Sequence, residues 1–154
     1  MGLDMYLTKK TYVKNWNYMK PEEKHEITIK KGGKIREDIK PERVSEIEEE
    51  IMYWRKVNAL HAWFVKNVQE GEDDCKSYCV EYEQLKELRD TIRKVLKNHE
   101  LAEELLPTQV GFFFGGEAYD DYYFSELERT KKVLSEIIKD QRHFGGEFYY
   151  QSSW

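Results

Sequence analysis

The chain has 154 residues, which is enough for one domain but too short for two independent cores. Hydrophobic residues make up 40% and charged residues 36%, a composition typical of a soluble globular domain. The net charge of −5 argues against a protein that coats nucleic acid, because neutralising phosphates requires a basic surface.

The sequence also disfavours membrane and secreted proteins. No apolar run approaches the ~20 residues that span a bilayer, and residues 1–10 lack the basic start and apolar stretch of a signal peptide. Cys75 and Cys79 are too few for a disulfide framework. We therefore expect a cytoplasmic protein with reduced thiols and no membrane partner.

The first part of the chain predicts a strand, a hairpin and the start of a long helix. Apolar and polar residues alternate over residues 3–7, which predicts a half-buried strand. The stretch HEITIKKGGKI, residues 25–35, predicts a hairpin whose turn is the Gly-Gly pair. The residues between them are expected to form a loop. Pro41 suits the first turn of a helix, which is expected to run to about Asn67 and to stop before Gly71.

Spacing of apolar residues and glycines predicts the remaining elements. They are helices over 84–98 and 119–141, a helical turn at 101–107, and strands at 77–82, 108–116 and 145–154. Together they predict one α+β domain spanning residues 1–154. Its antiparallel or mixed sheet would have about four to five strands, covered by two long helices and one shorter helix.

Polar residues on the first long helix are the most unusual feature. At about 100° per residue, Arg55, Asn58 and His61 fall on the same side as its aliphatic residues. Such buried groups need partners, because an unpaired buried charge costs several kcal/mol. Glu126 interrupts the apolar stripe of the last helix in a similar way. One interpretation is a buried Arg55–Glu126 salt bridge; the other is a ligand cavity.

In the cavity interpretation, Arg55 holds an anionic group and the other polar side chains form hydrogen bonds. Tryptophan and tyrosine rings would stack on the ligand, and the glycine-flanked strand at 108–116 would form one wall. A small anionic, nucleotide-type ligand suits this mixture of arginine and aromatic residues. The candidate ligand-binding residues are Trp54, Arg55, Asn58, His61, Trp63, Phe113, Tyr119 and Glu126.

Other motifs give weaker indications. The stretch GFFFGGEAYDDYY lacks the GK[ST] of a phosphate loop, and its acidic residues suit a helix cap. Cys75 and Cys79, three residues apart, lack the second pair typical of a zinc site. We expect no cofactor, no metal and no catalytic residue, although His61 with Asp74, Cys75 or Glu126 would serve a small enzyme.

Taken together, the blocks MGLDMYL, YWRKVNALHAWFV, DDC, LLPTQVGFFFG, YDDYY and FYYQSSW resemble a family of small proteins encoded by bacteriophages and prophages. The resemblance covers nearly the whole chain and implies a single domain, but it implies no catalytic residues. Small acidic phage proteins of this kind are often accessory factors that counter host defence. Some bind a host protein, and others sequester a nucleotide-derived signal.

The leading hypothesis is therefore a non-catalytic phage or prophage accessory protein that sequesters a small anionic, nucleotide-type ligand. The first alternative is an inhibitor that binds a host protein through an acidic, tyrosine-rich surface. The second is a small enzyme that uses His61 as acid or base. A homodimer is compatible with the sequence, because proteins of this size often share ligand sites between subunits.

Overall fold

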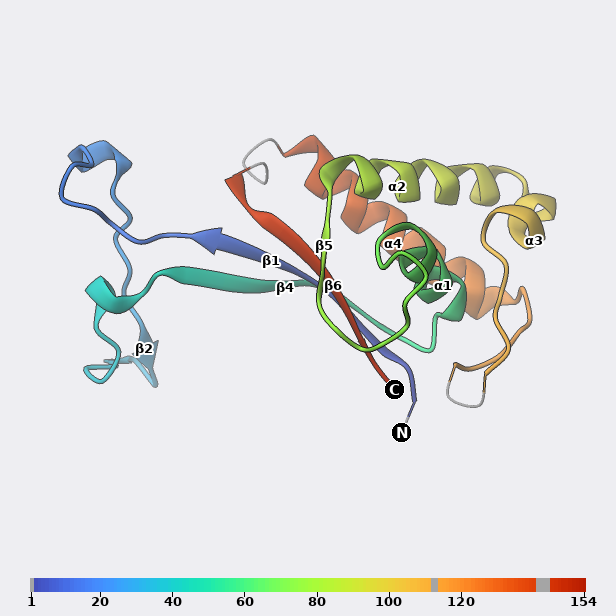
Figure 1. The fold of residues 1–154 in the computed structure, drawn as a ribbon, viewed down its shortest axis with the longest axis horizontal. Helices are drawn as coiled ribbons and strands as arrows, with labels where there is room; N and C mark the ends of the chain where they lie inside the picture. Colours follow the sequence, from blue (N-terminus) through green and yellow to red (C-terminus); the bar gives the residue numbers. More distant parts are fainter. Residues whose placement is uncertain (1, 112–113, 141–144) are drawn as a thin grey trace.

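The computed structural model describes residues 2–111, 114–140 and 145–154, and it confirms the α+β fold class. Figure 1 shows a body of helices and strands from which two strands project to a separate tip. The elements in chain order are β1 (Asp4–Tyr12), η1 (Pro21–Glu23), β2 (Lys30–Lys31), β3 (Lys34–Ile35), η2 (Pro41–Arg43), β4 (Glu46–Arg55), α1 (Asn58–Asn67), β5 (Tyr78–Val80), α2 (Tyr82–Lys97), η3 (His99–Leu101), α3 (Ala102–Leu105), α4 (Asp121–Lys139) and β6 (Glu147–Ser153). Each helix in the described parts of the chain is too short or too polar to span a bilayer.

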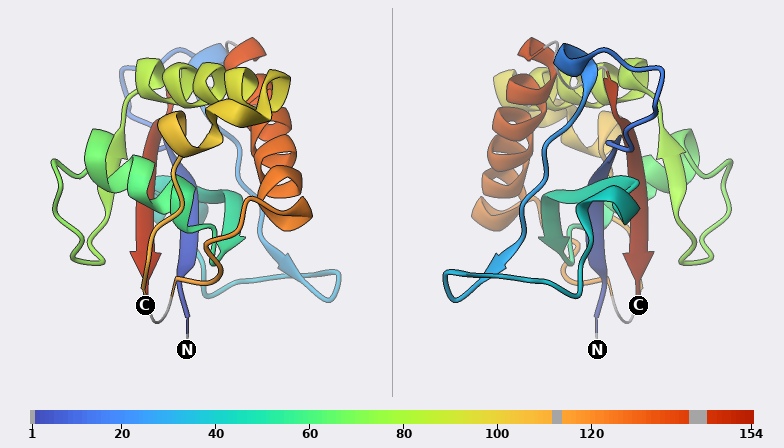
Figure 2. Two further views of the ribbon diagram at one scale, coloured as in Figure 1. Left: turned by 90° about the vertical axis from the view of Figure 1, so that its right-hand side faces the viewer. Right: turned by 90° about the vertical axis from the view of Figure 1, so that its left-hand side faces the viewer.

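The main sheet has four antiparallel strands in the order β4-β1-β6-β5. Figure 2 shows β6 beside β1, with the two ends of the chain close together. Burial alternates along β1, where Met5 and Leu7 are buried while Tyr6 and Thr8 are not. The predicted period-2 strand at the start of the chain is thereby confirmed, and one face of the sheet is left accessible to solvent.

The helices pack on the buried face of the sheet and on one another. Leu60 and Phe64 of α1 lie in the same core as Trp54 of β4, and α2 packs against α4. The predicted helices over 84–98 and 119–141 correspond to α2 and α4 and are confirmed. The predicted strands at 77–82 and 145–154 correspond to β5 and β6 and are also confirmed.

The predicted helix from Pro41 to Asn67 is wrong in its first half. Pro41 begins only the short 3-10 turn η2, residues 46–55 form strand β4, and α1 starts at Asn58. In β4 the run of glutamates lies opposite lysines of β1, with Glu48 facing Lys10. These cross-strand pairs offset the repulsion between the glutamates, and the isoleucines and aromatic residues of β4 suit a strand.

The predicted strand at 108–116 is also wrong for its described residues. Thr108 to Gly111 and Phe114 to Gly116 form an irregular loop, whereas Phe113 lies outside the described residues. Gly115 has a φ of +92°, in the left-handed region that interrupts an extended run. Gly115 therefore bends the chain just after Phe114 instead of ending a strand.

The β1–β4 pair extends past the body of the molecule. Strand β6 pairs with β1 only as far as Lys10, whereas β4 pairs with it as far as Tyr12. Residues 13–45, here called the tip, lie at the far end of this projection (Figure 1). The predicted hairpin is confirmed within the tip as β2 and β3, and Gly32 and Gly33 make its turn with φ of +57° and +80°.

Candidate functional site

The two tryptophans predicted to stack on a ligand belong to the core of the body. Trp54 is fully buried, and its Nε1 donates a hydrogen bond to Thr130 Oγ1 at 2.7 Å. Trp63 packs edge-on against Phe64 with ring centroids 5.4 Å apart. Their large apolar surfaces are therefore covered by protein, and they stabilise the fold.

The predicted salt bridge between Arg55 and Glu126 is wrong. Arg55 is exposed at the end of β4, and Glu126 instead pairs with Arg129, one turn along α4, at 2.7 Å. The physical reason is the strand: neighbouring residues of a strand point to opposite faces, so Trp54 takes the inward position and Arg55 points away. Helix α4 still contacts β4, because the Tyr122 hydroxyl donates a hydrogen bond to the backbone carbonyl of Arg55 at 2.6 Å.

Asn58 is buried at the start of α1 and holds the irregular loop in place. Its Nδ2 donates to the carbonyl oxygens of Phe114 at 3.1 Å and Gly116 at 2.9 Å. Its Oδ1 accepts a hydrogen bond from the Gln109 amide at 2.8 Å. Tyr119 adds a fourth contact, because its hydroxyl accepts from the Thr108 amide. Asn58 and Tyr119 thus position backbone instead of presenting free polar groups.

His61 is buried on α1, and protein groups engage both of its ring nitrogens. Nδ1 lies 2.7 Å from the Tyr150 hydroxyl, and Nε2 lies 3.0 Å from Asp73 Oδ2. Burial raises the pKa of Tyr150 well above its ordinary value, so the phenol beside Nδ1 stays protonated. A carboxylate oxygen only accepts, so Nε2 carries a proton and donates a hydrogen bond to Asp73.

The second oxygen of Asp73 has its own donor. Trp154 Nε1 donates to Asp73 Oδ1 at 3.1 Å, so the carboxylate is held between an indole and an imidazole. The Asp73 side chain is nevertheless 28% exposed. Each carboxylate oxygen has two lone pairs, and so each retains the capacity to accept a further hydrogen bond.

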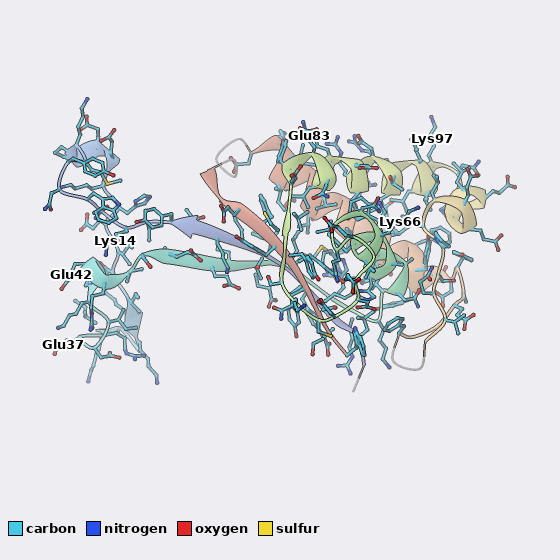
Figure 3. All side chains as sticks on the ribbon, in the orientation of Figure 1. Lys14, Glu37, Glu42, Lys66, Glu83 and Lys97 are labelled. Carbon is cyan, nitrogen blue, oxygen red and sulfur yellow. The ribbon has the colours of Figure 1, made fainter. Side chains whose placement is uncertain are left out.

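A cavity of about 560 Å³ lies beside this carboxylate, between α1 and the loops that contain Asp73 and Phe114. We call it the Asp73 pocket. Its volume falls within the range of ordinary small-molecule sites. Lys66 and Glu70 contribute opposite charges to it, and Figure 3 labels Lys66 on α1. Further lining residues are His61, Ala62, Val65 and Val110.

Of the predicted site residues that the structure describes, only His61 lines the Asp73 pocket. Asp73, Phe114 and Lys66 were missed, as was Tyr150 behind His61. Tyr150 carries a readable signal, since the alternation along β6 places it on the buried face, where its hydroxyl needs a partner. Asp73 carries no such signal, because several acidic residues surround it in the sequence and only folding singles it out.

Within the described parts of the chain, neither cysteine lies in a group of side chains that could hold a metal ion. Cys75 and Cys79 are free thiols, and the residues that the structure describes contain no group of three or more His, Cys, Asp or Glu side chains arranged to hold a metal ion. Asp74, next to the pocket residue Asp73, is occupied by local contacts with Lys76 and Tyr78. Its hydrogen bond from Lys76 lowers the pKa of the Asp74 carboxyl.

Comparison of the chain with protein-family models, with curated proteins and with solved structures finds no match.

Proposed function

We propose that the protein is a non-catalytic binding protein whose small-molecule site is the Asp73 pocket. The observation that carries this proposal is the partly exposed Asp73 carboxylate, fixed by His61 and Trp154 at the wall of a cavity of about 560 Å³. A side chain held by its neighbours loses little freedom when a ligand arrives. It therefore binds a hydrogen-bond donor more tightly than a mobile side chain does.

The contacts of His61 favour binding over catalysis. A general acid or base needs a nitrogen within hydrogen-bonding reach of its substrate, whereas Tyr150 and Asp73 engage both nitrogens of this ring. His61 instead orients Asp73 through the hydrogen bond from Nε2. The proposed role of His61 is therefore to position the residue that touches the ligand.

The chemistry of the pocket supports a ligand of nucleotide type with a guanine-like edge. A carboxylate pairs well with two adjacent N–H donors, which guanine has, while adenine presents one donor beside an acceptor. Phe114 offers an aromatic surface, and Lys66 supplies a cation for a phosphate. In this proposal Lys66 replaces Arg55 as the residue that meets the anionic group.

The resemblance to small phage and prophage proteins gives the proposal a biological setting. Tight binding without turnover lowers the free concentration of a ligand. A phage accessory protein that did so would blunt a host response signalled by a nucleotide. We therefore propose sequestration of a nucleotide-derived host signal as the role of the Asp73 pocket.

Isothermal titration against cyclic mono- and dinucleotides and ADP-ribose-derived nucleotides tests the proposal. Guanine-containing nucleotides should bind more tightly than their adenine counterparts. Asp73→Asn should weaken that binding by roughly 10- to 100-fold, because a charge-assisted pair of hydrogen bonds is lost. Asp74→Asn is the matched control and should bind normally, since Asp74 contacts Lys76 and Tyr78 and does not line the pocket. Absence of binding across the panel, or an equal loss in both variants, would reject the proposal.

The open face of the sheet favours a second candidate function, the binding of a host protein. Tyr6 and Tyr53 lie side by side on it with ring centroids 5.3 Å apart, and Tyr149 follows on the neighbouring strand. Tyrosine is enriched in protein interfaces because it contributes a large area at a low cost in conformational entropy. Affinity capture from a host lysate tests this function: a stoichiometric partner lost on Tyr53→Ser supports it, and retention of that partner rejects it.

A further inference from the structure

The tip has almost no core of its own. Between residues 12 and 50, Val13 is the one buried residue, and its amide donates to the Ser45 carbonyl where the tip joins the strands. In the body, by contrast, the sheet and helices share one continuous core. Burial of apolar surface therefore does not explain why the tip is folded.

Local hydrogen bonds order the tip instead. The side chain of Asn15 pairs with the backbone of His25, donating at 2.7 Å and accepting at 2.8 Å. Arg36 binds Asp38 through its side chain, with Nε 2.7 Å from Oδ1, and Arg43 donates to the Asp38 carbonyl at 2.8 Å. These contacts fix the backbone while leaving the larger side chains of the tip uncovered.

Several large apolar side chains of the tip and its base face solvent. Tyr18 is 82% exposed and Ile35 64% exposed, and Trp16 stacks on Tyr18 with an angle of 5° between the rings. Further exposed members are Tyr12, Ile29 and Ile47. A preorganised segment that presents apolar groups in this way is typical of an interaction surface.

The charge of the tip is opposite to that of the body. Residues 13–45 contain nine Lys or Arg and six Asp or Glu, a net charge of +3, whereas the other residues contain 16 and 24, a net charge of −8. The hairpin KKGGKIR is the most basic part, with Lys30, Lys31, Lys34 and Arg36 within seven residues. Figure 3 shows the tip's charged side chains, Lys14, Glu37 and Glu42 among them, well separated from the body.

We propose that the tip docks on the acidic body of a second copy of this chain. The two copies would form a homodimer in which the tip of each subunit contacts the body of the other. One chain supplies both complementary surfaces, a basic tip with apolar groups and an acidic body, so a two-fold pair satisfies both at once. The projecting β1–β4 pair gives the tip the reach to contact a neighbour (Figure 1).

Two other interactions, strand pairing between two copies and binding of nucleic acid, fit the observations less well. Pairing of β4 with β4 of a second copy would set the run from Glu46 to Glu50 against its own like charges. Nucleic acid would be repelled by the body, and it would leave the isoleucines of the tip uncovered. The self-complementary charge therefore favours a second copy.

Sedimentation of the full chain over a range of concentrations tests the proposal. The wild-type protein should form a dimer whose dissociation constant rises with salt, because opposite charges hold the subunits together. Reversing the charges of Lys30, Lys31 and Lys34 to Glu should weaken dimerisation about tenfold or more. The control reverses three exposed basic residues of α2 and α4 to Glu: Arg93, Lys94 and Lys132.

The control changes the net charge by the same amount but makes the body more acidic, so it should not weaken the dimer. Ile35→Ser should also weaken the dimer, and its circular dichroism should match that of the wild type. A chain that is monomeric at all concentrations overturns the proposal, as does a dimer that tolerates the tip reversals as well as the control does. Binding of duplex DNA that is lost only in the tip variant would assign the tip to nucleic acid and would also overturn it.

Cross-linking locates the contact independently of affinity. Unlabelled and isotope-labelled chains are mixed and treated with a carbodiimide, which joins lysine to a neighbouring carboxylate. The proposal requires mixed-isotope cross-links between tip lysines and carboxylates of the body. If Lys30, Lys31 and Lys34 cross-link only within their own chain, the tip does not dock on a second copy.

Discussion

The body and the tip of this protein are stabilised by different means. The body buries aliphatic and aromatic residues from a four-stranded sheet and from helices α1 to α4 in one core. The tip buries little and is ordered by hydrogen bonds between polar side chains and backbone. Apolar burial makes a structure cooperative, whereas local hydrogen bonds contribute little net free energy each. The same kind of hydrogen bond should therefore contribute far more to stability in the body than in the tip.

Asn58→Ala should give the largest effect and tests the body. Its side chain makes three hydrogen bonds to the backbone of the 108–116 loop, and the residue is buried. Without the amide, these backbone groups lose their partners beside the core. We expect the free energy of unfolding to fall by about 2–3 kcal/mol. Urea denaturation measures this loss.

Asn67→Ala is the companion variant for Asn58→Ala within α1. Asn67 makes one side-chain hydrogen bond from its Nδ2, to the Trp63 carbonyl of its own helix. That carbonyl is also a potential acceptor for the helix backbone, so the loss should be distinctly smaller. If both variants lost the same free energy of unfolding, the hydrogen bonds from Asn58 to the loop would contribute no more than the single hydrogen bond of Asn67.

Tyr150→Phe should give an intermediate effect and has a signature in pH. At neutral pH the variant leaves His61 Nδ1 without its hydrogen-bond partner, and the stability should fall by about 1–2 kcal/mol. Burial raises the pKa of Tyr150 well above its ordinary value of 10, so the folded state holds the phenolic proton more tightly than the unfolded state. The contribution of this proton is complete below pH 10 and is lost as the pH rises above it.

Urea denaturation between neutral pH and about pH 11 separates the loss of the hydrogen bond to His61 from the pH dependence caused by the raised pKa of Tyr150. The wild type should lose stability steeply above pH 10, and Tyr150→Phe should lose it less steeply. Tyr18→Phe is the control, since Tyr18 is exposed in the tip and its removal should leave the slope unchanged. If the Tyr150→Phe slope equals that of the wild type, the phenol is not held protonated by the fold.

Much of the body was predictable because its elements have strong periodic patterns. The alternation that begins at Leu3 gave β1, and the spacing from Leu85 to Val95 gave α2. The region from Pro41 to Asn67 misled because the apolar residues of strand β4 and of helix α1 after it fit one helical period. Residues 46–55 form a strand instead of a helix because they pair with β1, which is far away in the sequence.

The candidate site was predictable only in part. The sequence pattern puts His61 among apolar residues, and this correctly indicates that its ring needs hydrogen-bond partners. Its partners, Asp73 and Tyr150, come from a loop and from a distant strand, and chain folding alone brings them within 3.0 Å. Arg55 was misplaced by the same error that turned β4 into a helix, since the period decides on which side a residue lies.

Asn15→Ala should give the smallest effect and is the counterpart of Asn58→Ala in the tip. Asn15 makes two hydrogen bonds to the backbone of His25, yet it is exposed and far from the core. We expect the free energy of unfolding to change by less than about 0.5 kcal/mol, because water replaces the lost partners. Hydrogen exchange of the His25 amide should nevertheless accelerate, since its acceptor is removed. A loss of stability as large as that of Asn58→Ala would show that the tip folds cooperatively with the body, and the distinction between the two regions would fail.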